Sequence, residues 1–228
     1  MSDTLQLFLK IFSRAMMLLL VLPVTNCARG LVARWQGDDS ADHAGRITLN
    51  PMAHLDLLGS LAILLCGFGW SKPMPINPAR MRSYKRGVIL VSLAGPVTHF
   101  LSAVILMNIN AIFLNCMTVT SDNVVAVLAV SYVISTIASI NICLGVINIL
   151  PLPPMDGFNV LHQLAGNKFN RWYYQNYRVI NQASFIILMI LFFIGDITDG
   201  RIDPLMRLIM WVANILGKTT FWVPMVFG

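Results

Sequence analysis

Residues 88–117 read VILVSLAGPVTHFLSAVILMNINAIFLNCM, and this long stretch contains no Asp, Glu, Lys or Arg. A helix of about 20 mostly apolar residues is long enough to cross the hydrocarbon core of a bilayer. The stretch therefore predicts a transmembrane helix, and it indicates that the whole chain belongs in a membrane.

The composition of the rest of the chain agrees with a membrane protein. Of the 228 residues, 57% are hydrophobic and 11% are charged, and the mean hydropathy is +0.71. An ordinary soluble domain has about 25% charged residues. The net charge of +6 comes from basic residues in short segments between apolar runs. That distribution favours an anionic lipid bilayer as the partner and argues against nucleic acid.

Other apolar runs flank the first one. The run at Leu55–Trp70 is short and contains three glycines, so it either crosses thinly or re-enters. Between residues 33 and 54, Gly37, Gly45 and Pro51 interrupt a polar insert, which predicts a small extended or β element. We expect an all-α polytopic membrane protein with five or six membrane segments. The further predicted segments are Leu7–Val32, Asn123–Leu150, Val179–Ile194 and Leu205–Phe227.

The charges of the loops predict an orientation. The segments 71–87 and 157–180 are basic and contain no acidic residue, whereas the loop at 117–122 carries only Asp122. Because positive loops face the cytoplasm, we expect 71–87, 157–180 and the C-terminus on that side of a multi-pass protein.

Three segments carry a family resemblance. Residues 37–41 read GDDSA and residues 45–56 read GRITLNPMAHLD; residues 68–78 read FGWSKPMPINP, with Ala94-Gly95-Pro96 further on; residues 148–157 read NILPLPPMDG. In this order they resemble the compact branch of the site-2 proteases, which are intramembrane zinc metalloproteases. The resemblance implies a membrane core at 1–165, followed by a C-terminal two-helix membrane extension at 166–228.

The resemblance also locates the residues that would bind zinc. The family uses two histidines and a glutamate from an HExxH motif, together with the aspartate of an Asp-Gly motif. Here the HExxH slot falls on Thr25-Asn26-Cys27-Ala28-Arg29, and only Asp156 matches. Threonine is a poor zinc ligand, arginine stays protonated, and asparagine cannot act as a general base. We therefore expect no catalytic residue, no metal, no cofactor and no enzyme activity.

The same positions predict an ion pair and a remnant of the family's substrate groove. An arginine in an apolar segment is costly, so we expect Arg29 to pair with Asp156. Alternatively, Arg29 snorkels to the interface and Asp156 caps a helix or turn. A broken backbone at membrane depth is tolerated where it lines a cavity or is covered by protein. The predicted groove residues are Asn141, Asn148, Pro151, Pro153, Pro154 and Gly157.

These features favour a catalytically inactive family member. It would bind transmembrane helices of other proteins and act as a scaffold or accessory subunit of a hetero-oligomeric membrane complex. One alternative is a divergent, active intramembrane zinc metalloprotease. Another is a transporter or channel-lining subunit, although the spans contain few polar residues.

Overall fold

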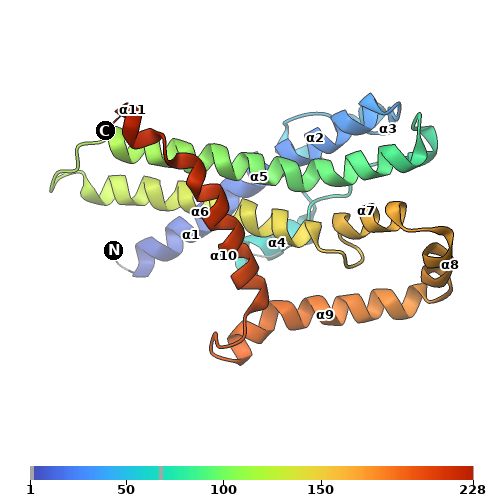
Figure 1. The fold of residues 1–228 in the computed structure, drawn as a ribbon. Helices are drawn as coiled ribbons and strands as arrows, with labels where there is room; N and C mark the ends of the chain where they lie inside the picture. The colour runs from blue at the N-terminus through green and yellow to red at the C-terminus, as the bar shows by residue number, and fades with distance from the viewer. Residues whose placement is uncertain (1–2, 67–68, 228) are drawn as a thin grey trace.

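A computed structural model describes residues 3–66 and 69–227 of the chain. Residues 67 and 68, which belong to the second apolar run and the second motif, lie outside the described residues. All regular elements that are described are helical (Figure 1). The α-helices are α1 (Asp3–Met16), α2 (Leu22–Trp35), α3 (Ser40–His43), α4 (Leu57–Cys66), α5 (Tyr84–Cys116), α6 (Val124–Ile149), α7 (Asp156–Leu164), α8 (Asn167–Gln175), α9 (Tyr177–Ile197), α10 (Pro204–Gly217) and α11 (Val223–Phe227).

Four helices in the described part of the chain are long and apolar enough to cross a membrane, by length and composition. They are Thr4–Trp35, Tyr84–Cys116, Val124–Ile149 and Tyr177–Gly195. The first of these joins α1 and α2 through a π-helical turn, η1 (Met17–Val21). The expected five or six segments are not confirmed. At a rise of about 1.5 Å per residue, α4 with 10 residues and α10 with 14 are too short to span.

The segment around α4 folds back on itself. A Cβ added to Gly59 would lie 2.1 Å from the carbonyl oxygen of Trp70, so the two ends of this segment touch. The Arg14 side chain on α1 donates hydrogen bonds of 2.9 Å to the carbonyls of Leu64 and Leu65 at the end of α4. These bonds satisfy carbonyl groups that a helix end leaves without partners. Gly59 and Trp70, on the two sides of this segment, thus lie next to each other.

The predicted small extended element between residues 33 and 54 is not confirmed, because the described residues contain no strand. That segment instead forms α3 and a short 3₁₀ turn, η2 (Pro51–Ala53). The backbone N–H of Ser40 donates to the Asp38 carboxylate, and that of Met52 donates to the Asn50 side chain. Such local bonds compete with the pairing that a strand would need.

The centre of the fold is the antiparallel pair α5 and α6, with α2 and α7 packed at one end (Figure 1). His99 on α5 and Asn141 on α6 are buried and share a hydrogen bond of 3.0 Å. Small residues allow the close approach: a Cβ on Gly145 would lie 2.6 Å from the Phe100 ring. Polar pairs and small residues of this kind hold helices together in membranes.

The C-terminal part of the chain is arranged differently. Helix α9 runs beside the core at a distance, and α10 crosses back over it to α5 (Figure 1). The side chain of Asn108, near the far end of α5, contacts Thr219 and Trp222. The C-terminus thus lies at the end opposite the basic loops. The expected cytoplasmic position of the C-terminus stays a prediction.

Candidate functional site

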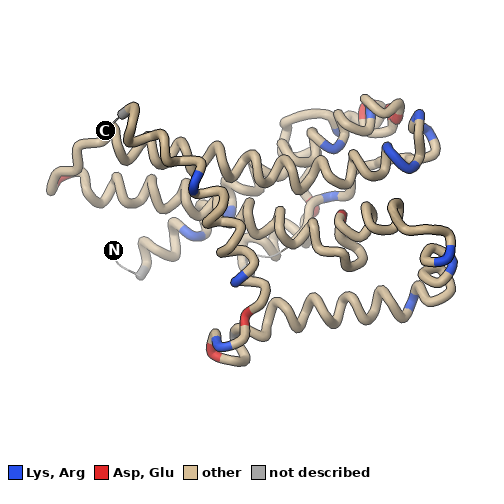
Figure 2. Tube along the Cα trace, in the orientation of Figure 1, with Lys and Arg blue, Asp and Glu red and all other residues tan. Residues whose placement is uncertain are grey.

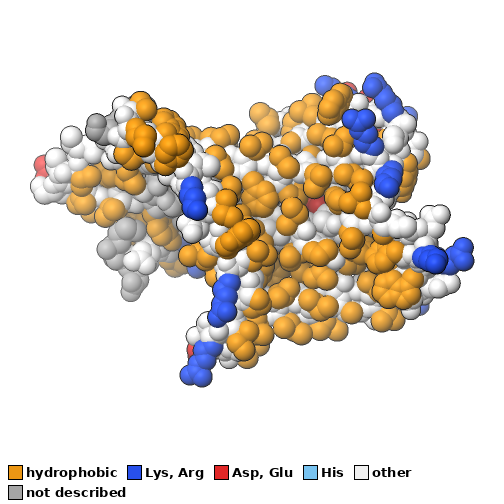
Figure 3. Space-filling view, in the orientation of Figure 1, with side chains coloured by type: hydrophobic (Ala, Val, Ile, Leu, Met, Phe, Trp, Pro, Cys, Tyr) orange, Lys and Arg blue, Asp and Glu red, His pale blue; other side chains and the backbone are white. Residues whose placement is uncertain are grey.

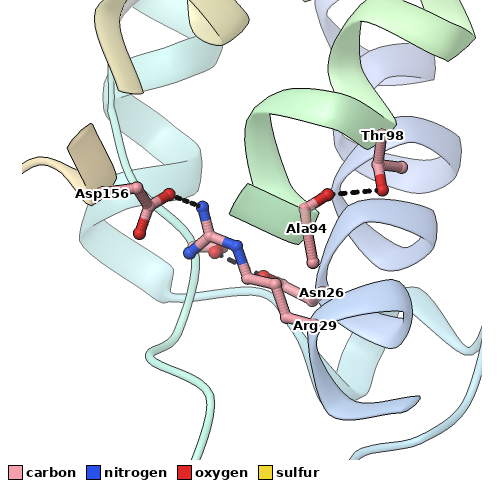
Figure 4. A network of polar contacts seen from close by, with 6 residues as sticks. Asn26, Arg29, Ala94, Thr98 and Asp156 are labelled. Carbon is pink, nitrogen blue, oxygen red and sulfur yellow. Dashed lines mark hydrogen bonds and ion pairs between the residues drawn. The ribbon is translucent and has the colours of Figure 1, made fainter. Parts of the chain in front are cut away.

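Arg29 and Asp156 form an ion pair at the junction of α2 and α7 (Figure 4). Arg29 lies near the end of the first span. Asp156 is the first residue of α7 and follows the irregular segment 150–155, which contains three prolines. The two side chains keep 24% and 14% of their surface exposed. The structure thus brings together the two side chains that the sequence leads us to expect as an ion pair.

A glycine on α5 makes room for the arginine. A Cβ added to Gly95 would lie 2.2 Å from Nη2 of Arg29, so the guanidinium rests directly against the α5 backbone. A Cβ here would therefore require the guanidinium to shift. The motif Ala94-Gly95-Pro96 therefore has a local physical role in this chain. Arg29 Nε has no hydrogen-bond partner within the described residues.

Thr25 and Asn26, which also belong to the predicted HExxH slot, lie on α2 with Arg29. Thr25 is only 3% exposed, and its hydroxyl oxygen has no partner in the described part of the chain. The side-chain amide of Asn26 donates a hydrogen bond of 3.1 Å to the Ser71 hydroxyl. Asn26 therefore ties α2 to the loop that follows α4, which is a structural contact.

Burial and the Arg29 guanidinium shift the pKa of Asp156 in opposite directions. Burial raises the pKa of Asp156, and the nearby Arg29 guanidinium lowers it; the burial effect is larger, so the pKa lies above its usual value. A carboxyl group with a raised pKa becomes protonated at a higher pH than an exposed one. Protonation of Asp156 would remove its attraction to Arg29, so the pair weakens as the pH falls toward that raised value.

A cavity of about 520 Å³ opens beside the ion pair. Helix α5 forms one wall and α7, α8 and the start of α9 form the other. Aromatic rings line the second wall: the Phe158 and Tyr173 rings lie 4.9 Å apart, and His162 meets Tyr173 at 5.3 Å and Tyr174 at 5.4 Å. Arg29 and Asp156 also line this cavity, whose lining combines aromatic and apolar residues with polar ones.

The predicted groove residues separate into two groups. Pro153 and Pro154 line the cavity, whereas Asn141, Asn148, Pro151 and Gly157 are not among its lining residues. Asn141 is instead fully buried against His99. A Cβ on Gly157 would lie 2.0 Å from the carbonyl oxygen of Ile149, so this glycine lets α7 pack against the end of α6.

The residues of this site do not fit a zinc ion. No three His, Cys, Asp or Glu side chains cluster closely enough to hold a metal in the described residues. A catalytic zinc ion normally has three protein ligands and an open position for water. Here the guanidinium of Arg29 already engages the carboxylate of Asp156.

Several residues at or near the site were not predicted from the sequence. Ser71 holds Asn26, and His162 forms part of the aromatic wall. Ser71 lies in a loop and His162 lies in a short helix, so neither belongs to a periodic pattern in the sequence. Ring-bearing residues between 158 and 177 were visible in the sequence, but their packing around one cavity depends on the turn between α7 and α8.

Comparison with known proteins gives two matches. Residues 114–192 match the model of peptidase family M50. The chain is 31% identical to "Putative zinc metalloprotease YwhC" of Bacillus subtilis (strain 168) over 197 residues, which cover 84% of this chain and 80% of that protein. No solved structure is significantly similar to the chain.

These matches correct one prediction. The expectation that the chain is not an enzyme is wrong, because the matched family is a peptidase family and the relative is named as a metalloprotease. The expectation relied on one five-residue slot, whereas the similarity extends over most of the chain.

Proposed function

Since the chain belongs to peptidase family M50, the site-2 protease family, we propose that it binds transmembrane segments of other membrane proteins in the cavity beside Arg29 and Asp156. In this proposal it acts as a subunit of a membrane complex. The family resemblance of the chain is confirmed by the comparisons; the binding role is our inference from the site.

The observation that carries the proposal is the loose packing of α9 beside the cavity. Only 11% of the residues in its most apolar stretch are buried within the protein, against 28–39% in the other three spans. Apolar side chains cover the face of the molecule between α9 and the core (Figure 3). A second apolar helix could cover this surface while lipid still surrounds the complex.

The cavity favours a polypeptide over a small polar solute. Its aromatic wall offers apolar contact, and the ion pair together with polar side chains such as Ser92 supplies donors and acceptors. A transmembrane segment that unwinds locally presents backbone N–H and C=O groups that need partners in this setting. Within the described residues, Nε of Arg29, which lines the cavity, has no hydrogen-bond partner.

Intramembrane proteolysis is a second candidate, and the family membership favours it. It requires the same first step, because a protease must also hold a transmembrane segment. Since the residues at Asp156 do not fit zinc, we assign no catalytic step to them. The two candidates differ in whether the bound segment is recovered intact or cut.

We also propose the orientation and domain division that the sequence predicts. The basic segments 71–87 and 157–180 lie at the same end of the molecule (Figure 2), which supports a cytoplasmic position for both. Labelling of single introduced cysteines with a membrane-impermeant reagent, in intact cells and in inverted vesicles, tests this orientation.

The division at residue 165 is tested by expressing 1–165 and 166–228 as separate chains and measuring whether they associate.

The binding proposal is tested by site-specific photocrosslinking in native membranes. A photoreactive phenylalanine derivative replaces Tyr174, which lines the cavity and is 64% exposed. The control replaces Leu101, which is 58% exposed on α5 and outside the cavity lining. We expect peptides from transmembrane segments to be cross-linked at position 174 and not at position 101.

Lipid adducts alone at position 174, or equal peptide yields at both positions, would contradict the proposal. The state of the captured peptide separates the two candidates. An intact segment supports binding as the function. A cut segment whose cleavage disappears in Asp156→Ala supports proteolysis.

A further inference from the structure

We infer that a second, smaller cavity binds the phosphate of an anionic phospholipid. The cavity has a volume of about 190 Å³ and is lined by Trp35, Gln36, Arg82, Ser83 and Arg86. A water molecule in the liquid takes up about 30 Å³, so there is space for a phosphate group. Two guanidinium groups and no carboxylate lie in its lining, so the site favours an anion.

The start of α5 supplies further hydrogen-bond donors. The first helical bond runs from the Gly87 N–H to the Ser83 carbonyl, and no side chain caps this helix. The backbone N–H groups of the first turn therefore have no partners inside the helix. A 33-residue helix also carries a partial positive charge at its N-terminus, and phosphate groups bind at such positions.

An independent observation points to a ligand at this place. The Gln36 side chain is only 9% exposed and lines the cavity, yet it makes no hydrogen bond within the described residues. Neither atom of this amide belongs to the fully buried unpartnered atoms of the described residues, so the amide opens onto the cavity, where a ligand can meet it. Its NH₂ group can donate to a phosphate oxygen. Neither Arg82 nor Arg86 has an acidic partner among the described residues.

The position of the cavity selects a lipid as the source of the phosphate. The first span ends at Trp35 and the second begins at Tyr84, so the cavity lies where two spans leave the membrane. Trp35 is 67% exposed there, and tryptophan is common at the level of the lipid headgroups. The backbone N–H of Arg82 also donates to the Gln36 carbonyl, which holds the two sides of the cavity together.

A bound phosphate would strengthen this connection between α2 and α5. Those helices also carry Arg29 and Gly95, so the lipid would stabilise the junction from its outer end. The site is separate from the larger cavity, since the two share no lining residue. The lipid assignment therefore does not depend on the proposed function.

Native mass spectrometry of the full-length protein in an uncharged detergent tests the inference. The probes are phosphatidic acid and phosphatidylcholine with the same acyl chains. Arg82→Gln combined with Arg86→Gln should weaken phosphatidic acid binding about thirtyfold, at about tenfold per 1.4 kcal/mol and about 1 kcal/mol per basic residue. The matched control, Lys168→Gln combined with Arg171→Gln, removes the same charge from the other basic loop and should leave binding within about twofold of the wild type.

Two further arms complete the experiment. Gln36→Glu places a negative charge in the cavity and should also weaken the binding of phosphatidic acid, while phosphatidylcholine binds weakly throughout. Equal losses in the two double variants would overturn the inference, since they would show diffuse charge attraction. Binding of inorganic phosphate as tight as that of phosphatidic acid would also overturn it, since it would identify free phosphate as the ligand.

Discussion

Helices α6 and α9 have nearly the same hydropathy but very different surroundings. In its most apolar stretch, α6 has 28% of its residues buried within the protein, and α9 has 11%. The buried face of α6 contains Asn141 and Gly145, which meet His99 and Phe100 of α5. Lipid is as apolar as leucine, so helices in a membrane associate through small and polar residues. Apolar sequence alone therefore places a helix in the bilayer without deciding its neighbours.

The largest expected effect contrasts a buried isoleucine of α6 with an exposed one of α9. Ile142 is 3% exposed and Ile190 is 52% exposed. Ile142→Ala should lower the free energy of unfolding by about 3 kcal/mol, because it leaves a cavity among packed side chains. Ile190→Ala should change it by less than about 0.5 kcal/mol. Thermal unfolding in detergent measures both; equal losses would show that α9 packs as tightly as α6.

The second effect concerns the ion pair. Arg29→Met leaves a largely buried carboxylate without its cation and should cost about 2 kcal/mol, and Asp156→Asn should cost a similar amount. In the double variant the two losses should not add, because each removes the same interaction. Chemical denaturation of the four proteins gives the coupling energy. A coupling near zero would mean that the two side chains act independently.

Much of this arrangement follows from the sequence, but not all of it. Long uncharged runs predict α5, α6 and α9, since a span needs about 20 apolar residues. The motifs around 25–29 and 156 located Arg29 and Asp156, which the structure places in contact. The end of α4 is held by Arg14, a residue far away in the sequence that donates hydrogen bonds to the carbonyls of Leu64 and Leu65. Pattern and composition do not encode such a contact.

The His99–Asn141 hydrogen bond of the packed helix α6 can be compared with a hydrogen bond of the less buried helix α9. Asn141→Leu should cost about 1 kcal/mol, the usual value for a polar pair between membrane helices. Asn181→Leu on α9, where the side chain donates to the Tyr177 carbonyl of its own helix, should cost less. Thermal unfolding of both variants tests the order. A greater loss at Asn181 would reverse the comparison of the two helices.

The smallest effect is expected outside the spans, at Asp38. Burial acts to raise the pKa of this carboxyl, but hydrogen bonds from Ser40 and Asn77 outweigh it, so the pKa lies below its usual 3.8. The ionised group therefore contributes stability above pH 3.8, and this is lost as the pH falls through the lowered value. Asp38→Asn should remove this pH dependence and cost about 0.5 kcal/mol at neutral pH, because one oxygen still accepts a bond. Unfolding curves of the wild type and the variant across the acid range provide the check, and an unchanged acid profile in the variant would contradict this assignment.

The central claim about the site is that Arg29 holds the carboxylate that a family metal would otherwise bind. Metal analysis of the purified protein by inductively coupled plasma mass spectrometry, beside Asp156→Ala, tests it most directly. We predict no zinc that depends on Asp156, because its carboxylate is paired with a guanidinium. One zinc per chain in the wild type, lost in Asp156→Ala, would contradict the claim and show that Asp156 is a metal ligand.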